Sequence, residues 1–224
     1  MVTDIALLRL LQLVSPSLPI GMYSYSQGME SAVADGWLTT SDEVREWLTG
    51  IMTHTLTCVD LPILARLYDA WQADDLAGLT YWQSRLPAYR ETAELRLEDR
   101  QCGQALARLL SLLGYSEMQD WIRNADTTLA FVFAYAANIW GITKSAALTG
   151  YLWSWLENQV LCAVKLIPLG QVAGQKLLVS LAEEIPALVD QALSLNDEDI
   201  GGGTISLALA SSRHEMQYTR LFRS

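Results

Sequence analysis

A chain of 224 residues that is 51% hydrophobic and 18% charged has enough apolar material for one packed domain, which excludes a disordered chain. The formal net charge is −10 and only three residues are lysines, which argues against a nucleic-acid-binding protein because such proteins need a basic face. The three cysteines are far apart and lack the spacing of a zinc site. Isolated core thiols favour a reducing compartment, and Asp4 and Arg9 interrupt any apolar leader, so we expect no signal peptide.

The first part of the chain predicts short helices separated by a strong turn signal. The leucines within residues 4–14 share one side of a short helix. Two prolines and a glycine make residues 15–21 a fixed turn. Residues 23–36 follow as a helix with apolar side chains buried, and Gly36 ends it.

A capping box marks the next helix. Thr40 stands three residues before Glu43, and the apolar side chains then keep helical period as far as Cys58. Pro62 suits the first turn of a helix, so we expect the chain to restart there as a separate helix. A further helix is predicted over about residues 74–85.

The middle of the chain holds the longest periodic segment, over residues 89–113, and Gly114 ends it. It begins polar and becomes apolar toward its end. A short helix over residues 117–123 and an apolar helix over residues 129–140 follow.

The stretch around which the chain is organised is residues 150–174, and between residues 151 and 167 only Glu157 and Lys165 are charged. A helix that is apolar nearly all round must be buried on most sides, so we expect a central helix with other helices wrapped around it. Pro168 ends it. The side chains expected deepest in the core are Leu152, Trp155 and Leu166. The narrow polar line consists of Ser154, Asn158 and Lys165.

The last part of the chain predicts a proline-divided helix over residues 171–195, then an acidic, glycine-rich surface loop over residues 196–203. A short helix over residues 205–210 precedes a tail, residues 211–224. Since no useful strand alternation occurs, the sequence predicts an all-α fold. We expect a single domain, residues 1–224, with about ten helices around the buried central helix.

A membrane hairpin over residues 129–156 is the alternative for the least charged part of the chain. A spanning helix needs about 20 apolar residues, and this run is shorter and interrupted by polar residues such as Asn138 and Thr143. We expect a buried helical pair and no membrane contact.

Few residues offer chemistry. His54 and Cys58 are four apart, as two metal ligands on one helix face would be, but no third ligand is near in sequence. His214 has no local partner. No GxSxG or Walker pattern occurs, and the acids upstream of Gly201 would repel a phosphate. We therefore expect no enzyme activity, no cofactor and no tightly bound metal; the alternative is an enzyme whose site is built from distant residues.

Two cationic features each allow two interpretations. Lys165 is either a cation at the end of a helix, where the helix dipole favours it, or a charge held at an interface. The tail carries Arg213, Arg220 and Arg223 with two aromatic side chains. It either folds back on the acidic body of its own chain or docks on a partner, because Tyr and Arg are enriched in interface hot spots.

Four separated blocks of sequence resemble the urease accessory protein family UreF. They are LLQLVSPSLPIGMYSYSQGME, TAELRLEDRQ, GYLWSWLENQVLCAVKLIPLGQVAGQ and SSRHEMQYTRLFRS, and they occur in the order expected for that family between Leu10 and Ser224. Met22 departs from the family pattern, which usually has glycine there, so a glycine-only backbone angle at Met22 is not expected.

The resemblance implies a non-enzymatic, cytoplasmic, all-α protein that forms a homodimer within a larger complex. Its partners would be UreD, bound to the urease apoprotein, and the nickel-carrying GTPase UreG, whose GTP hydrolysis and metal release it would control. Nickel would be handled by the complex and not bound tightly by this chain. The tail block implies partner-binding roles for Tyr218, Arg220, Leu221 and Phe222. The other blocks add Tyr25, Gln27, Glu157 and Lys165.

Overall fold

The computed structural model describes residues 4–224, and every regular element in that part of the chain is a helix, as the sequence predicts. The α-helices are α1 (Asp4–Leu13), α2 (Met29–Ala34), α3 (Ser41–Ile51), α4 (Leu61–Gln72), α5 (Leu76–Arg85), α6 (Ala93–Leu112), α7 (Leu129–Ile139), α8 (Lys144–Leu166), α9 (Gln171–Ala182), α10 (Ile185–Ser194) and α11 (Ile205–His214). A π-helical segment spans Met52–Asp60, and short 3-10 helices span Met22–Ser24, Leu86–Tyr89, Ser116–Trp121 and Asp197–Asp199.

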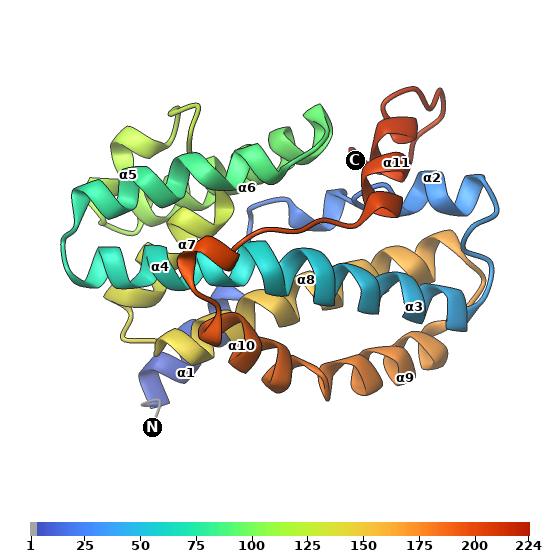
Figure 1. Cartoon of the computed structure of the whole chain (residues 1–224), viewed down its shortest axis with the longest axis horizontal. Coiled ribbons are helices and arrows are strands. Elements are labelled where there is room, and N and C mark those ends of the chain that lie inside the picture. Colours follow the sequence, from blue (N-terminus) through green and yellow to red (C-terminus); the bar gives the residue numbers. More distant parts are fainter. Residues whose placement is uncertain (1–3) are drawn as a thin grey trace.

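The longest rod of the molecule is one continuous helix of 32 residues, Ser41–Gln72, made of α3, the π-helical segment and α4 (Figure 1). The predicted capping box is confirmed at its start, where Thr40 Oγ1 accepts from Glu43 N at 3.3 Å and Glu43 Oε2 accepts from Thr40 N at 2.9 Å. The predicted helix with Pro62 in its first turn is confirmed as α4, but the chain does not break before it. Because the helix has left the i→i−4 hydrogen-bond pattern just before Pro62, the proline's missing N–H does not end it.

This rod is also the one helix of residues 4–224 that is long and apolar enough to cross a membrane. However, 72% of its most apolar window is buried inside the protein, so packing accounts for its composition. The segment weighed as a membrane hairpin lies in the core as well. Helix α7 packs against α4 and α6, and its residues from Ala130 to Ala137 are all buried.

The central helix is confirmed as α8, which packs against α4, α9 and α10. Leu152 and Trp155 are buried as expected, but Leu166 is only partly buried because the helix ends there, at the edge of the core. Of the polar line of α8, only Lys165 faces solvent. Ser154 and Asn158 are buried, and Asn158 Nδ2 donates to the carbonyl oxygen of Tyr25 at 3.0 Å.

The predicted helix over residues 23–36 is broken in the structure. Gln27 and Gly28 both have positive φ, 53° and 79°, which a right-handed helix cannot contain. At Gly28 the backbone also passes so close to α11 that a Cβ atom would stand 2.6 Å from the backbone nitrogen of Ser211. The break therefore serves a close approach between segments far apart in the sequence, and α2 begins after it.

The two ends of the described chain differ in how they pack against the rest of the protein. Helix α1 leaves the apolar side chains of Ile5, Leu8 and Leu11 exposed. Helix α11 runs four residues further than predicted, to His214, and packs against α2. The chain then turns back, so that its end lies beside α11 and α2 (Figure 1).

Candidate functional site: the C-terminal tail and its acidic cradle

The end of the tail is paired with the segment that precedes α2. The carbonyl oxygen of Ser224 accepts from the backbone N–H of Ser26 at 2.9 Å and from its hydroxyl at 2.6 Å. The N–H of Arg223 donates to the carbonyl oxygen of Ser24 at 2.8 Å. Phe222 and Ser224 are buried, with 5% and 0% of their surface exposed. The last residues of the tail therefore form part of the folded body.

Three glutamates from two helices hold the tail, and we call Glu30, Glu94 and Glu98 the acidic cradle. Glu30 of α2 accepts the backbone N–H groups of Leu221 at 2.7 Å and Phe222 at 2.8 Å, one with each carboxylate oxygen. On α6, Glu94 binds the Arg220 guanidinium at 2.7 Å, and Glu98 accepts the Ser224 hydroxyl at 2.9 Å. Hydrogen bonds to an ionised acceptor are stronger than neutral ones, so the cradle fixes the direction of the tail.

His214, at the end of α11, lies between two members of the cradle and is completely buried. Its Nδ1 is 2.7 Å from Glu94 Oε2, and its Nε2 is 3.4 Å from Glu30 Oε2. The sequence showed no local partner for this histidine. Its two partners lie 120 and 184 residues away in the chain.

Gln27 and Tyr25 lie beneath the tail and link it to the central helix. Gln27 Nε2 donates to Glu98 Oε1 at 2.8 Å, and the Trp155 indole N–H donates to Gln27 Oε1 at 2.8 Å. Burial raises the pKa of Glu98 to about 7, against the lowering effect of its bonds to Gln27 and Ser224. The Tyr25 hydroxyl donates to Gln101 at 2.5 Å, and burial raises its pKa. Gln27 thus supports the cradle from inside, and Tyr25 ties the same segment to α6.

The outer side of the tail remains open. Tyr218 is fully exposed and Leu221 is 66% exposed, whereas Arg220 is turned inward to Glu94. Of the two arrangements left open for the tail, the structure has the one in which it folds on its own acidic body. Partner binding by the outer side stays a prediction.

Lys165 lies beside the part of the tail that contains Phe222. It lies in the last turn of α8, is exposed, and its Nζ is 5.6 Å from the centre of the Phe222 ring. A cation over an aromatic face is a weak attraction at an exposed site. A shallow concavity is lined there by Tyr23, Ser24, Lys165, Leu221, Phe222 and Arg223. The structure thereby brings together three of the predicted residues, Lys165, Leu221 and Phe222.

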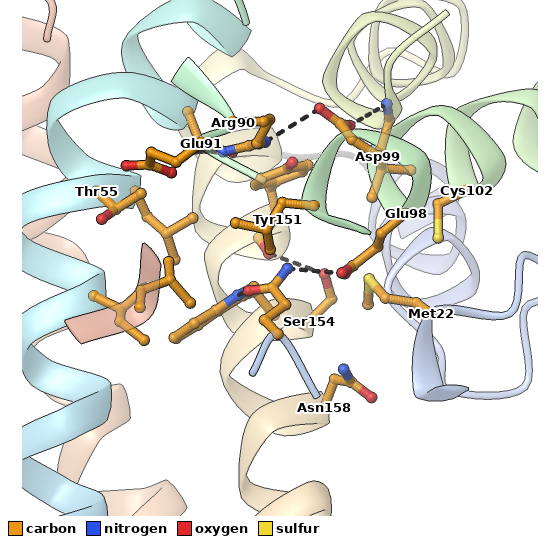
Figure 2. A pocket seen from close by; sticks show the side chains of 18 residues that line it. Met22, Thr55, Arg90, Glu91, Glu98, Asp99, Cys102, Tyr151, Ser154 and Asn158 are labelled. Atoms are coloured by element: carbon orange, nitrogen blue, oxygen red, sulfur yellow. Dashed lines mark hydrogen bonds and ion pairs between the residues drawn. The ribbon is translucent and has the colours of Figure 1, made fainter. Parts of the chain in front are cut away.

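A second buried polar cluster lies next to the cradle, around a cavity of about 50 Å³ (Figure 2). Arg90 pairs with Asp60 and, at 3.4 Å, with Asp99, and Asp99 accepts the N–H of Leu129 at 2.8 Å. Burial opposes the charge of Arg90, but the two aspartates hold its pKa well above the ordinary value. Figure 2 shows Glu98 and Asp99 reaching the cavity from α6, and Tyr151 and Ser154 from α8. The cavity has room for a few water molecules.

The thiols and histidine singled out in the sequence are not grouped as metal ligands in the described residues. Burial raises the pKa of the Cys102 thiol beside the cavity, which keeps it protonated and a poor nucleophile. His54 is exposed, and the thiol of Cys58 donates to the carbonyl oxygen of Thr53 at 3.3 Å. Within residues 4–224 no three His, Cys, Asp or Glu side chains are grouped so as to hold a metal ion.

Glu157 lies apart from the tail. It is half-buried against a small cavity of about 30 Å³ that is also lined by Leu13, Pro16 and Tyr23, and burial raises its pKa. Tyr23 lines this cavity and also the concavity beside Lys165 and Phe222.

Sequence reasoning missed the residues that hold the tail: Glu30, Glu94, Glu98 and His214. A signal was present, because each lies in one of the sequence blocks that resemble a known family. The structure shows what these blocks share. Segments around residues 24–30, 94–101, 155–165 and 211–224 meet at the tail.

Comparisons with known proteins confirm the family resemblance. The family model described as UreF matches residues 38–182. A protein named "Urease accessory protein UreF" from Alkalilimnicola ehrlichii is 52% identical over 216 residues, which is 96% of this chain and 95% of the relative. Proteins of the same name from Pseudomonas putida strain GB-1 and from Teredinibacter turnerae are each 49% identical, covering 99% and 97% of this chain and 99% and 98% of the relatives.

Proposed function

The chain belongs to the UreF family of urease accessory proteins, and we propose that it is a non-enzymatic adaptor which joins UreD on the urease apoprotein to the GTPase UreG. In this role it controls GTP-dependent delivery of nickel to the urease active site. It acts in the cytoplasm, as a homodimer within the complex.

The observation that carries the proposal is that the tail is held by its backbone while some of its side chains stay exposed. Its backbone is bonded to Glu30 and Ser26, while the side chains of Tyr218 and Leu221 point away from the body. A partner that binds a segment already held in place loses less conformational entropy than one that must order it. Exposed aromatic side chains of this kind are enriched among the residues that dominate binding energy.

Nickel enters this proposal as cargo of the complex. Residues 4–224 offer no group of three side chains suited to a metal ion, and a closed nickel site needs more than the isolated pair His54 and Cys58. We therefore assign the handling of nickel to the assembled complex. Equilibrium dialysis that finds a stoichiometric, micromolar nickel site in this chain alone would contradict the assignment.

The test is capture of UreG by the chain co-expressed with UreD. Tyr218→Ala removes an exposed ring that no described residue hydrogen-bonds, so the fold should keep its melting temperature. We expect UreG affinity to fall by about 30-fold or more, since loss of a hot-spot side chain costs about 2 kcal/mol or more.

The matched control is Val172→Ala, which truncates an exposed apolar side chain on α9 and should leave capture unchanged. UreG retained at the affinity of the unmodified chain by Tyr218→Ala and Leu221→Ala together would refute the tail as the docking element. A loss of UreG with Val172→Ala as well would place the contact outside the tail.

A further inference from the structure

His214 is the most enclosed titratable group of the tail region. Both of its ring nitrogens face carboxylate oxygens, Glu94 Oε2 at 2.7 Å and Glu30 Oε2 at 3.4 Å, and its side chain has no exposed surface. Water cannot replace either partner at a site that is closed to solvent. The number of protons on the ring must therefore suit hydrogen bonds to both carboxylates.

A neutral imidazole donates from one nitrogen and accepts at the other. An ionised carboxylate only accepts, so a neutral His214 would set one ring lone pair against a carboxylate oxygen. A doubly protonated imidazole donates from both nitrogens and carries a positive charge between two negative ones. The geometry fits the doubly protonated ring.

The same two carboxylates also hold the tail. Glu30 accepts the backbone N–H groups of Leu221 and Phe222, and the second oxygen of Glu94 binds Arg220 at 2.7 Å. His214 thus links α2 to α6 at the point where Glu30 and Glu94 bind the tail. If its second proton leaves, the two helices face each other there with two negative charges and one fewer donor.

We propose that His214 is a positioning residue for the tail: its doubly protonated ring joins Glu30 to Glu94 and thereby holds residues 220–222, and loss of that proton releases them. The consequence for partner binding rests on the proposed function, because it is the outer side of these residues that would meet UreG. The contacts that hold the tail, by contrast, lie entirely within this chain.

Other charged groups close to this cluster belong to α2, α6, the tail and α8, whose Lys165 lies 5.6 Å from the Phe222 ring. Glu30 comes from α2, Glu94 from α6, and Arg220 from the tail. Glu215 accepts the N–H of Ala93 at 3.0 Å, and Arg213 pairs with Asp35 at 2.5 Å. Glu98, one turn along α6, has a pKa of about 7 and titrates in the range of interest, so it needs its own control.

The first test measures the proton and the tail together in the isolated chain. The chain has two histidines, so a His54→Gln background leaves only the His214 ring to be followed by nitrogen-15 NMR. Amide hydrogen exchange at Leu221 and Phe222 is measured on the same samples from about pH 6 to about pH 9. Rates are corrected for the intrinsic pH dependence of exchange.

We expect the two amides to be protected wherever the ring carries two protons, and to exchange about tenfold faster or more wherever it carries one. If the ring keeps both protons throughout, protection should stay constant. His214→Gln should then lower it at every pH, because a glutamine amide has a single donor nitrogen in place of the two ring nitrogens that face Glu94 and Glu30. A singly protonated ring with protected amides, or a His214→Gln variant with unchanged protection, overturns the proposal.

A second variant separates positioning from mere packing. In Glu94→Gln the new amide can donate to Nδ1 of a neutral His214, whose Nε2–H then donates to Glu30, and the amide oxygen can still accept from Arg220. Protection of Leu221 and Phe222 should lose any dependence on pH, while in the control variant Glu98→Gln it should keep the dependence of the unmodified chain. A pH dependence that survives in Glu94→Gln but vanishes in Glu98→Gln would assign the effect to Glu98.

UreG capture at the two ends of the pH range distinguishes the two proposals. If exchange follows the His214 proton and capture does not, the positioning role stands and the tail is not the docking element. If capture depends on Tyr218 but exchange ignores the proton, the proposed function stands and the role of His214 is refuted.

Discussion

Two buried regions of this protein are held together by different forces. Where α7 meets α4 and α6, apolar packing dominates: Phe131 is fully buried, with its ring centre 5.1 Å from that of Trp71 and 4.4 Å from that of Trp121. In the acidic cradle the contacts are hydrogen bonds from the tail backbone and side chains to Glu30, Glu94 and Glu98. Apolar packing is non-directional and adds up over area, whereas hydrogen bonds to charged acceptors fix particular atoms. The apolar core therefore supplies most of the global stability, and the cradle fixes the position of one segment.

The largest loss of stability is expected from Phe131→Ala. Loss of a buried aromatic side chain leaves a cavity and should lower the free energy of unfolding by about 3–5 kcal/mol. Denaturant unfolding measures this value. A loss below about 1 kcal/mol would mean that the apolar region does not carry global stability, and the comparison would fail.

The pH dependence of the free energy of unfolding should reveal the ionisation of Glu98 in the cradle. Burial raises the folded-state pKa of Glu98 from 4.5 to about 7, so the folded protein holds this proton more tightly than the unfolded chain does. The resulting stability is fully present below pH 4.5 and is lost as the pH rises through about 7. The loss should be about 3 kcal/mol, and Glu98→Gln should abolish it. An equal slope in both proteins between these pH values would show that Glu98 does not cause it.

The sequence could predict what depends on neighbours in the chain. The apolar circumference of α8, the capping box at Thr40 and the helix end before Pro168 are all local patterns, and all are present in the structure. The break at Gln27 and Gly28 could not be predicted, because it serves the approach of α11 from the other end of the chain. The π-helical segment before Pro62 had no sequence signal that we recognise.

The cradle left one clue in the sequence. Glu94 and Glu98 are four residues apart on α6, and such a like-charge pair destabilises an isolated helix. The structure supplies the reason for the pair, since Glu94 faces His214 and Arg220, and Glu98 faces Gln27 and Ser224. All of these partners are distant in sequence, so pattern reasoning alone could not find them.

A smaller effect on stability is expected from Arg220→Ala. Arg220 is partly exposed and binds Glu94, so its loss should loosen the tail by about 1–3 kcal/mol, the value of a bond between charged groups, without lowering global stability. UreG capture in the presence of UreD should fall. Arg213→Ala removes a different surface pair, with Asp35, and should do less. If Arg220→Ala melts early, the tail belongs to the global core and the distinction between the regions is wrong.

The smallest effect is expected from Lys165→Ala. An exposed cation in the last turn of a helix is worth only about 0.3–1 kcal/mol, and its contact with the Phe222 ring adds little in water. The melting temperature should hardly change, while activation of urease by the complex should fall. An unfolded variant would show that Lys165 is a structural charge.

The most direct test of the central claim, that the cradle fixes the tail from within, is hydrogen exchange at the amides of Leu221 and Phe222 in the isolated chain. Both donate to Glu30, so their exchange should be slowed on the order of 100-fold or more relative to an unstructured peptide, and Glu30→Ala should remove that protection without lowering the protection of α7. Exchange at the rate of an unstructured peptide in the unmodified chain would contradict the account.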